Sequence, residues 1–300
     1  MGDLNFNKEN MIRWYNEHSE NYDQESFTQS DDLYGGDAFR IELVAQTLKQ
    51  LKPKSVLDIG CGTGMPMMRL LQEGFNVRGF DLSPGMIEQA KKKLVAKGQD
   101  PKLAEVGDLL DPKLPEKYGR EAFDCVIANG VFPYLGPKEC EIGHKNILQI
   151  LKPGGWYLGA YTNELFDMFT LNRFTVNFYK KHFIDPLAVS EKEKAEIMED
   201  IKDLLTHPDA PASIPEGARD SIYVGGHNPL TLGNDLKAMG LIQKDIMFYK
   251  FHAFQPLLKK KNPERQKAFM KLSRDYEVKQ AKDWMGYFLA STFIVVCQKN

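Results

Sequence analysis

Three closely spaced glycines are the residues in this chain best suited to holding a ligand against the backbone. They lie in the loop GCGTG, residues 60–64, after an apolar run with a β-branched bias that predicts a buried strand over 55–60. Residues 66–73 predict a helix, so the loop joins a strand to a helix N-terminus, where a ligand can approach main-chain amides. The GxGxG spacing differs from the GxGxxG of dinucleotide sites, and Met65-Pro66 replaces the Lys-Ser/Thr of a P-loop. The alternative is that the glycines only permit tight packing.

Carboxylates near the ends of the first three predicted strands narrow the ligand further. Asp81 ends the strand predicted over 76–83, and such a side chain can accept hydrogen bonds from both hydroxyls of a ribose. Asp108 ends the next strand, where it can meet an adenine edge, and Asp58 lies inside the first strand, where it can organise the loop amides or meet a ligand ammonium. These three aspartates, together with the lack of a phosphate-binding lysine after the glycine loop, suit an adenosine derivative that carries a positive charge. S-adenosylmethionine is such a ligand.

Five segments in the order VLDIGCGTG, GFDLSPGMIEQAKKKL, GDLLD, FDCVIANGVFPYL and LKPGGWYL together cover residues 56–155. In sequence, order and approximate spacing this region resembles the class I S-adenosylmethionine-dependent methyltransferases. The resemblance implies an α/β fold of the Rossmann-like methyltransferase type: a doubly wound, mostly parallel seven-stranded sheet whose last strand runs antiparallel. It also implies S-adenosyl-L-methionine as the cofactor.

The resemblance also assigns cofactor contacts along the matched segments. Glycines of the loop approach the methionine part, Asp81 binds the ribose, two apolar residues line the adenine pocket, and Asp108 and its neighbour lie at the adenine edge. The full set is Gly60, Cys61, Gly62, Thr63, Gly64, Asp81, Leu82, Met86, Asp108, Leu109, Asn129 and Gly130.

The N-terminal segment WYNEHSENYDQ resembles the lid of small-molecule members of the family. Tyr22 or Tyr15 would close over the cofactor, and Arg40 is a candidate for binding its carboxylate. The alternative is that both tyrosines pack between helices and that Arg40 is solvated.

Residues for the methyl acceptor are less sharply marked. The aromatic stretch that opens an insertion at 164–226 predicts an acceptor lid, with Tyr161, Phe174, Phe178 and Tyr223 as candidate substrate contacts; the alternative is a hydrophobic cover for the sheet edge. His227 and His252 are candidate general bases, because a neutral imidazole accepts protons near physiological pH, although single histidines are more often structural.

These observations favour methyl transfer to a small-molecule acceptor, with an oxygen acceptor in a sugar or secondary metabolite preferred over nitrogen. The alternatives are an N-methyltransferase, with Tyr223, Glu164 and Asp167 around the amine, and a non-catalytic S-adenosylmethionine-binding subunit. The sequence NGVF at 129–132 lacks the Asn-Pro-Pro-Tyr/Phe signature of enzymes that methylate planar amino groups. A dehydrogenase is disfavoured by the loop spacing.

Strands and helices alternate along most of the chain and position these residues. Strands are predicted over 55–60, 76–83, 102–108, 123–132, 154–162, 241–251 and 286–300, and helices over 37–51, 66–73, 84–97, 139–151, 232–240 and within 256–283. The expected organisation is an N-terminal lid and first helix (1–52), a cofactor-binding core (53–163), the helical insertion (164–226) and the end of the core (227–300).

Composition sets the expected surroundings. The net charge of −2 gives no general attraction to nucleic acid or anionic lipid. Four cysteines without a CxxC pair indicate reduced thiols and no zinc site, and no apolar run reaches the length of a membrane span. We therefore expect a cytoplasmic protein with no metal, no nucleic acid and no membrane among its partners. The oligomeric state is left open.

Overall fold

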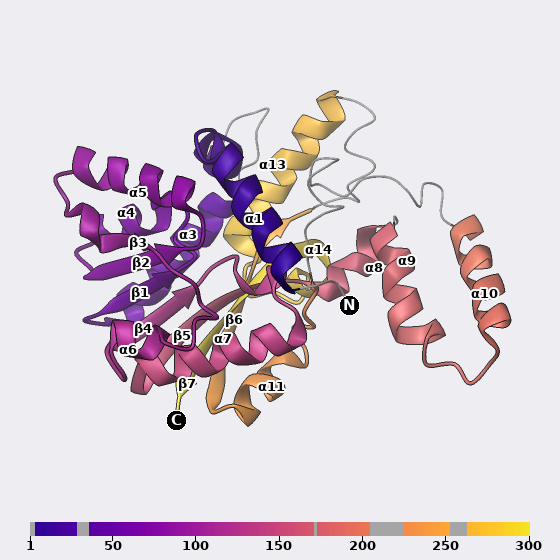
Figure 1. Cartoon of the computed structure of the whole chain (residues 1–300). Coiled ribbons are helices and arrows are strands. Elements are labelled where there is room, and N and C mark those ends of the chain that lie inside the picture. The colour runs from indigo at the N-terminus through magenta and orange to yellow at the C-terminus, as the bar shows by residue number, and fades with distance from the viewer. Residues whose placement is uncertain (1–3, 29–35, 171–172, 205–224, 253–262) are drawn as a thin grey trace.

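A seven-stranded sheet forms the centre of the computed structural model, which describes residues 4–28, 36–170, 173–204, 225–252 and 263–300 (Figure 1). Its order is β3-β2-β1-β4-β5-β7-β6, in which β1 to β5 run parallel and β7 runs antiparallel to both of its neighbours. The strands are β1 (Val56–Ile59), β2 (Val77–Asp81), β3 (Ala104–Val106), β4 (Phe123–Ala128), β5 (Leu151–Thr162), β6 (Leu241–Phe251) and β7 (Ala290–Lys299). The predicted fold class is confirmed.

Helices cover both faces of the sheet. One face packs against α3 (Asp37–Leu51), α4 (Met65–Gln72) and α5 (Pro84–Ala96), and the other against α6 (Leu114–Tyr118), α7 (Pro137–Ile150) and α11 (Leu232–Ala238). Most residues of β1 and β4 are buried between the two helical layers, which explains why these strands are mainly apolar in sequence.

Local signals fix where the helices near the glycine loop begin. Ser83 caps α5, because its Oγ accepts a hydrogen bond from Met86 N at 3.1 Å, and Pro84 occupies the first helical position. The cap also ends β2 at Asp81, two residues before the predicted end. The predicted helix over 37–51 coincides with α3.

Three further strand predictions also extend too far, including the one over 102–108, where β3 covers only Ala104–Val106. β4 ends at Ala128, because Gly130 adopts φ +74° and a 3-10 turn follows at Phe132–Tyr134. The last strand was expected from residue 286, but Gly286–Leu289 form the short helix α14. A turn precedes that helix, in which Asp283 Oδ1 accepts a hydrogen bond from Met285 N at 3.0 Å.

The N-terminal segment forms two helices, α1 (Leu4–His18) and α2 (Tyr22–Phe27), which pack against α5 and α3 respectively. In Figure 1, α1 crosses in front of the sheet. We call α1 and α2 the N-terminal cover.

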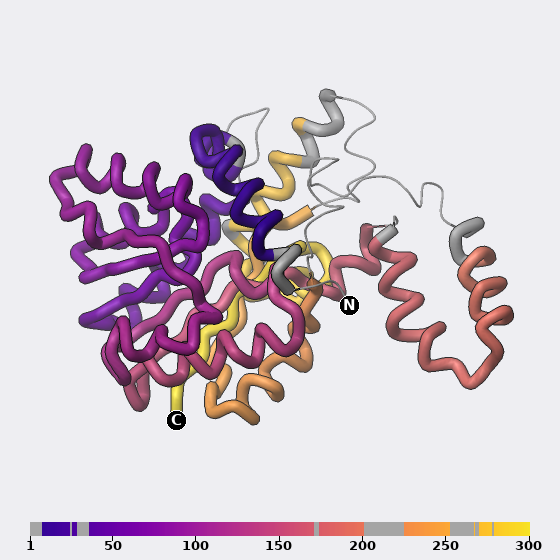
Figure 2. Tube along the Cα trace, in the orientation of Figure 1, coloured from indigo at the N-terminus to yellow at the C-terminus, as the bar shows by residue number. Residues whose placement is uncertain are grey.

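After β5 the chain leaves the sheet. It forms the 3-10 turn η3 (Glu164–Phe166), α8 (Asp167–Thr170), α9 (Arg173–Tyr179), the π-helical turn η4 (Lys180–Ile184) and α10 (Glu191–Leu204), which we call the insertion arm. Figure 2 traces α9 and α10 away from the sheet. The described part of the predicted insertion is therefore helical, as expected.

The C-terminal part returns to the sheet through β6 and β7, with α13 (Pro263–Lys279) between them. Among the helices of the described ranges, none combines the length and apolar character that crossing a lipid bilayer requires.

Candidate active site

A cavity of about 730 Å³ lies at the carboxyl ends of the parallel strands. Its floor comes from the glycine loop and the ends of β2, β3 and β4, and its roof from the N-terminal cover. One side wall comes from β5, β6 and β7. In an open α/β sheet this edge is where ligands bind, and the volume lies in the range of about 300–1,000 Å³ typical of small-molecule sites.

Two glycines of the loop, Gly62 and Gly64, have different structural roles. Gly62, at φ +55°, faces open space: a Cβ added there meets nothing within 4 Å, and the residue lines the cavity. Gly64, at φ +80°, does not line the cavity, and a Cβ there would come within 3.1 Å of Ala90 on α5. Gly62 thus leaves room for a ligand, whereas Gly64 lets α4 and α5 approach each other.

Asp81 holds the loop and the next turn together. Its Oδ2 accepts a hydrogen bond from Gly62 N and its Oδ1 accepts one from Ser83 N, each at 2.9 Å. Burial raises the pKa of Asp81, and these backbone hydrogen bonds partly oppose the rise. Leu82 and Met86, which the resemblance assigns to the adenine pocket, line the cavity beside it.

Asp108 already has a partner in this structure. Lys8 of α1 places its Nζ 2.6 Å from Asp108 Oδ2, while Leu110 N donates to Asp108 Oδ1 at 2.8 Å. Leu109 is buried and lines the cavity next to them. The N-terminal cover therefore reaches the position that the resemblance assigns to the adenine edge.

Asp58 is the least satisfied acid of the site. Its side chain is 0% exposed, and neither carboxyl oxygen has a hydrogen-bond partner within the described residues. Burial raises the pKa of Asp58 to about 7; the Asp81 charge adds to the rise and the Arg40 guanidinium opposes it. Asp58 itself does not line the cavity, although its chain neighbours Ile59 and Gly60 do. A buried carboxyl without a partner is stabilised by a cation that comes close to it.

Arg40 and Lys250 share one carboxylate. Arg40 Nη1 lies 3.3 Å from Asp37 Oδ1, and Lys250 Nζ lies 2.9 Å from Asp37 Oδ2. Arg40 is buried rather than solvated, and it reaches the fourth strand: a Cβ on Gly130 would lie 3.2 Å from Arg40 Nη1. All three charged residues line the cavity.

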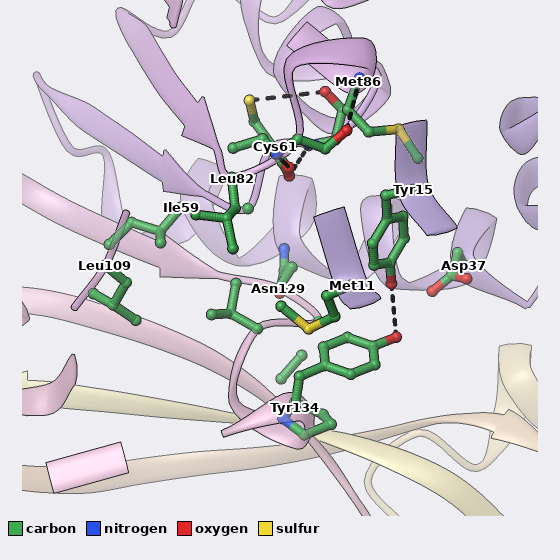
Figure 3. Close-up of a pocket in the computed structure, with 18 of the residues that line it drawn as sticks. Met11, Tyr15, Asp37, Ile59, Cys61, Leu82, Met86, Leu109, Asn129 and Tyr134 are labelled. Carbon is green, nitrogen blue, oxygen red and sulfur yellow. Dashed lines mark hydrogen bonds between the residues drawn. The ribbon is translucent and has the colours of Figure 1, made fainter. Parts of the chain in front are cut away.

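Tyrosines of the N-terminal cover close the roof. Tyr15 and Tyr134 point toward each other and join their hydroxyls at 2.7 Å, with Met11 and Asn129 nearby (Figure 3). Tyr22 packs edge-on against Tyr15 and lines the same cavity. Burial raises the pKa of both phenols, so they are neutral hydrogen-bonding groups.

Polar contacts fasten this cover to the floor. Asn16 Oδ1 accepts hydrogen bonds from Ser83 Oγ at 2.7 Å and Gly85 N at 2.8 Å. Asp23 binds Thr63 Oγ1 and pairs with Lys93. These contacts reach the loops that follow β1 and β2.

The two candidate bases lie in different surroundings. His252, at the end of β6, lines the cavity, and its ring lies 4.8 Å from that of Phe166. His227 does not line it: its Nε2 lies 4.0 Å from Cys140 Sγ, and its ring packs 4.8 Å from Tyr161. Burial lowers the pKa of His227 to about 4.

Sequence reasoning missed the buried histidine behind Tyr161. His144 Nε2 lies 2.8 Å from Tyr161 Oη, which also bonds Tyr157 Oη at 2.7 Å. Burial lowers the pKa of His144 to about 4. The signal was present, because His144 shares the buried face of α7 with Ile147. Tyr161 itself lines the cavity, as predicted.

The predicted acceptor residues of the insertion lie elsewhere. Phe174 and Phe178 are on α9 and do not line the cavity; Phe178 packs against His182 instead. Glu164 and Asp167 do not line it either, and Glu164 pairs with Lys181 at 2.8 Å. Tyr223 lies outside the described residues. The described part of the arm therefore supplies none of the lining residues.

Other lining residues carried no motif in the sequence. They are supplied by the N-terminal cover, by the start of α3, and by β6 and β7: Lys8, Met11, Asp37, Tyr249, Lys250, Ser291 and Thr292.

Comparisons with known proteins match the first half of the chain. Residues 56–155 match the family described as "Methyltransferase domain", and residues 5–93 match the one described as "Predicted AdoMet-dependent methyltransferase". The second match includes the N-terminal cover.

Curated relatives match less than half of this chain. The magnesium-protoporphyrin O-methyltransferase of Rhodobacter capsulatus is 33% identical over 135 residues, which cover 42% of this chain and 58% of that protein. The glycine N-methyltransferase of Rattus norvegicus is 33% identical over 120 residues, which cover 36% of this chain and 40% of that protein. The matched regions thus span 58% and 40% of the lengths of these two relatives.

A solved structure agrees over nearly the whole length. Magnesium protoporphyrin IX methyltransferase from Synechocystis PCC 6803, with bound SAH, superposes with a TM-score of 0.57 at 12% identity, covering 98% of this chain and 100% of that one. At this identity the likeness shows the fold alone.

Proposed function

We propose that this chain is a class I S-adenosylmethionine-dependent methyltransferase that methylates a small organic acceptor; the methyltransferase-domain match over residues 56–155, the AdoMet-dependent methyltransferase match over residues 5–93 and the curated methyltransferase relatives support it. One observation carries the proposal. A single cavity joins the glycine loop to a wall of polar side chains from β6 and β7, so cofactor and acceptor groups face one enclosed space.

The residues present fit the cofactor. Gly62 leaves open space above the loop. We assign the ammonium to Asp58, whose carboxyl lacks a hydrogen-bond partner within the described residues and lies next in the chain to the lining residue Ile59, not in the lining itself. We assign the ribose to Asp81, the adenine to Leu82, Met86 and Leu109, and the carboxylate to Arg40. When bound, the cofactor supplies an electrophilic methyl group for in-line displacement.

The chain's own contribution to the reaction is positioning and exclusion of water. Tyr15 and Tyr22 close the roof over the floor, and Asn129 and Gly130 line the floor at the end of β4. Such an enclosure aligns two reactants and removes solvent that would otherwise screen or compete with them.

We infer that the acceptor atom is an oxygen and that His252 removes its proton. His252 lines the cavity on the β6 side, whereas His227 lies behind Tyr161. An alcohol or phenol arrives protonated and benefits from a general base, while an amine with a free lone pair needs none.

The two histidines form a matched pair for the test. Methyl transfer is measured by mass spectrometry of S-adenosylhomocysteine and product after incubation with a panel of alcohols, phenols and amines. His252→Ala should lower kcat by about 10²–10⁴-fold and lose the pH dependence of a base, while His227→Ala should keep the rate.

Three results would contradict this function. Wild-type activity in the His252→Ala variant would show that His252 is not the base. A product methylated on nitrogen would overturn the oxygen acceptor. The lack of any turnover would contradict methyl transfer.

A further inference from the structure

Lys250 has an unusual backbone for a strand residue. It adopts φ +59°, in the left-handed region that residues other than glycine rarely occupy. Phe248 and Phe251 both face the α7 side of the sheet although they are three residues apart, while Tyr249 faces the α3 side. Regular alternation would put Phe248 and Lys250 on one face. The left-handed residue therefore changes the alternation and turns Lys250 toward α3.

Specific contacts receive the redirected side chain. Its ammonium lies 2.9 Å from Asp37 Oδ2 and 5.9 Å from the centre of the Tyr249 ring. Its stem passes over Gly36, where an added Cβ would come within 2.5 Å of Lys250 Cγ. The side chain remains 32% exposed and lines the cavity. Backbone strain kept at a cavity wall points to a function for the side chain it directs.

The charges near Lys250 alternate in sign. Asp58 interacts with Arg40, Arg40 pairs with Asp37, and Asp37 pairs with Lys250. Asp58, an acid, is at the end of the series near the glycine loop, and Lys250, a cation, is at the other end, on β6. The acidic end suits the cofactor's ammonium, and the cationic end suits an anion beside the acceptor wall.

We propose that Lys250 binds a carboxylate of the methyl acceptor, so that the substrates of this enzyme are small organic acids. This proposal rests on the proposed function. The cofactor also has a carboxylate, but Arg40 is the cation that reaches Gly130 on the cofactor floor. Lys250 instead neighbours His252 and Ser291, which belong to the β6–β7 wall.

The test compares small carboxylic acids with their primary amides. Binding of each pair to the protein saturated with S-adenosylhomocysteine is read by saturation-transfer NMR. The wild type should prefer acids to amides. Lys250→Met should weaken the best acid by about tenfold or more, the usual scale for a hydrogen bond to a charged group, and abolish the preference. Lys250→Arg should retain it.

Two controls isolate the role of the charge. Lys244→Met removes an exposed lysine from the same strand and should leave the preference intact. Asp37 keeps Arg40 as an ion-pair partner when Lys250 is lost. If Lys250→Met nevertheless unfolds the protein, Lys250→Gln keeps a polar group beside Asp37 without the positive charge and should fold without the acid preference.

A second arm distinguishes the two sources of a carboxylate. Calorimetry of S-adenosylhomocysteine should give the same affinity for Lys250→Met as for the wild type. A loss as large as that for the acids would assign Lys250 to the cofactor and overturn the proposal, as would the lack of an acid preference in the wild type. Failure of the wild type to bind S-adenosylhomocysteine would contradict the proposed function separately, since acid preference is also measurable without it.

Discussion

The N-terminal cover and the insertion arm are both helical additions to the sheet, but they are held differently. The cover is tied to the cofactor loops by Asn16, Asp23 and Lys8, and its tyrosines line the cavity. The arm is held within itself by pairs such as Lys181 with Glu164, and its first two elements, η3 and α8, contact α14, with η3 also contacting β7. Phe174 and Phe178 of the arm do not line the cavity, and Phe178 packs within the arm instead.

This difference shows that polar contacts, more than aromatic content, identify the helices that pack over the cavity. In the cover, Lys8, Asn16 and Asp23 each contact a residue in the loop that follows a parallel strand, and Asn16 and Asp23 also contact α5. Such contacts couple the closure of the roof to the shape of the floor. In the arm, the apolar residues Phe178 and Phe183 pack against each other instead.

The largest effect should come from breaking the floor that the cover encloses. Gly62→Val places a branched side chain in the open space of the cavity and imposes a residue disfavoured at φ +55°, so calorimetry should detect no binding of S-adenosylhomocysteine. Gly98→Val is the matched control, since Gly98 has φ +68° and equally open surroundings after α5. Loss of binding in both variants would mean that backbone strain, rather than ligand space, is responsible.

A pair of truncations compares the cover and the arm directly. Tyr15→Ala removes a ring from the roof and should weaken S-adenosylhomocysteine by about tenfold or more, the scale of one to a few kcal/mol for buried aromatic contacts. Phe178→Ala should reduce thermal stability but leave that affinity unchanged, because Phe178 is buried within the arm. The reverse pattern in calorimetry would make the arm the cofactor lid.

The smallest effect concerns protons. Asp58 has a pKa of about 7 in the folded protein, above its unfolded value, so its contribution to folding becomes less favourable as the pH rises from about 4 to 7. Cofactor binding should show the opposite trend, because the ammonium favours the ionised carboxyl: affinity should increase up to about tenfold per pH unit below 7 and then level off.

Calorimetry of S-adenosylhomocysteine between about pH 5.5 and about pH 8 measures this trend. Burial also raises the pKa of Asp81 in the same site, so a second carboxyl could produce the same trend. Asp58→Asn is therefore the control. That variant should bind weakly with a flatter profile. An unchanged slope would assign the proton to Asp81.

Contiguous signals made the fold and the cofactor floor predictable. The loop from Gly60 to Gly64, Asp81 and the strand ends after it lie in one continuous α/β segment, where spacing along the chain fixes spacing along the sheet edge. The predicted sheet and its antiparallel last strand are confirmed for the same reason.

The cavity wall that β6 and β7 form with the start of α3 could not be predicted in this way. Asp37, Arg40 and Lys250 meet across more than 200 positions of sequence, and the contact depends on one left-handed residue in β6. Spacing alone also gave no means of separating His252, on the cavity wall, from His227, behind it. Both histidines follow the insertion, and only the packing of Tyr161 decides between them.

Hydrogen–deuterium exchange with and without S-adenosylhomocysteine tests the difference between the cover and the arm most directly. The central claim is that the N-terminal cover closes over the cofactor and that the insertion arm does not. Ligand should slow exchange in 4–28 and in the glycine loop, with no change across 173–204. Protection of 173–204 without protection of 4–28 would contradict the account.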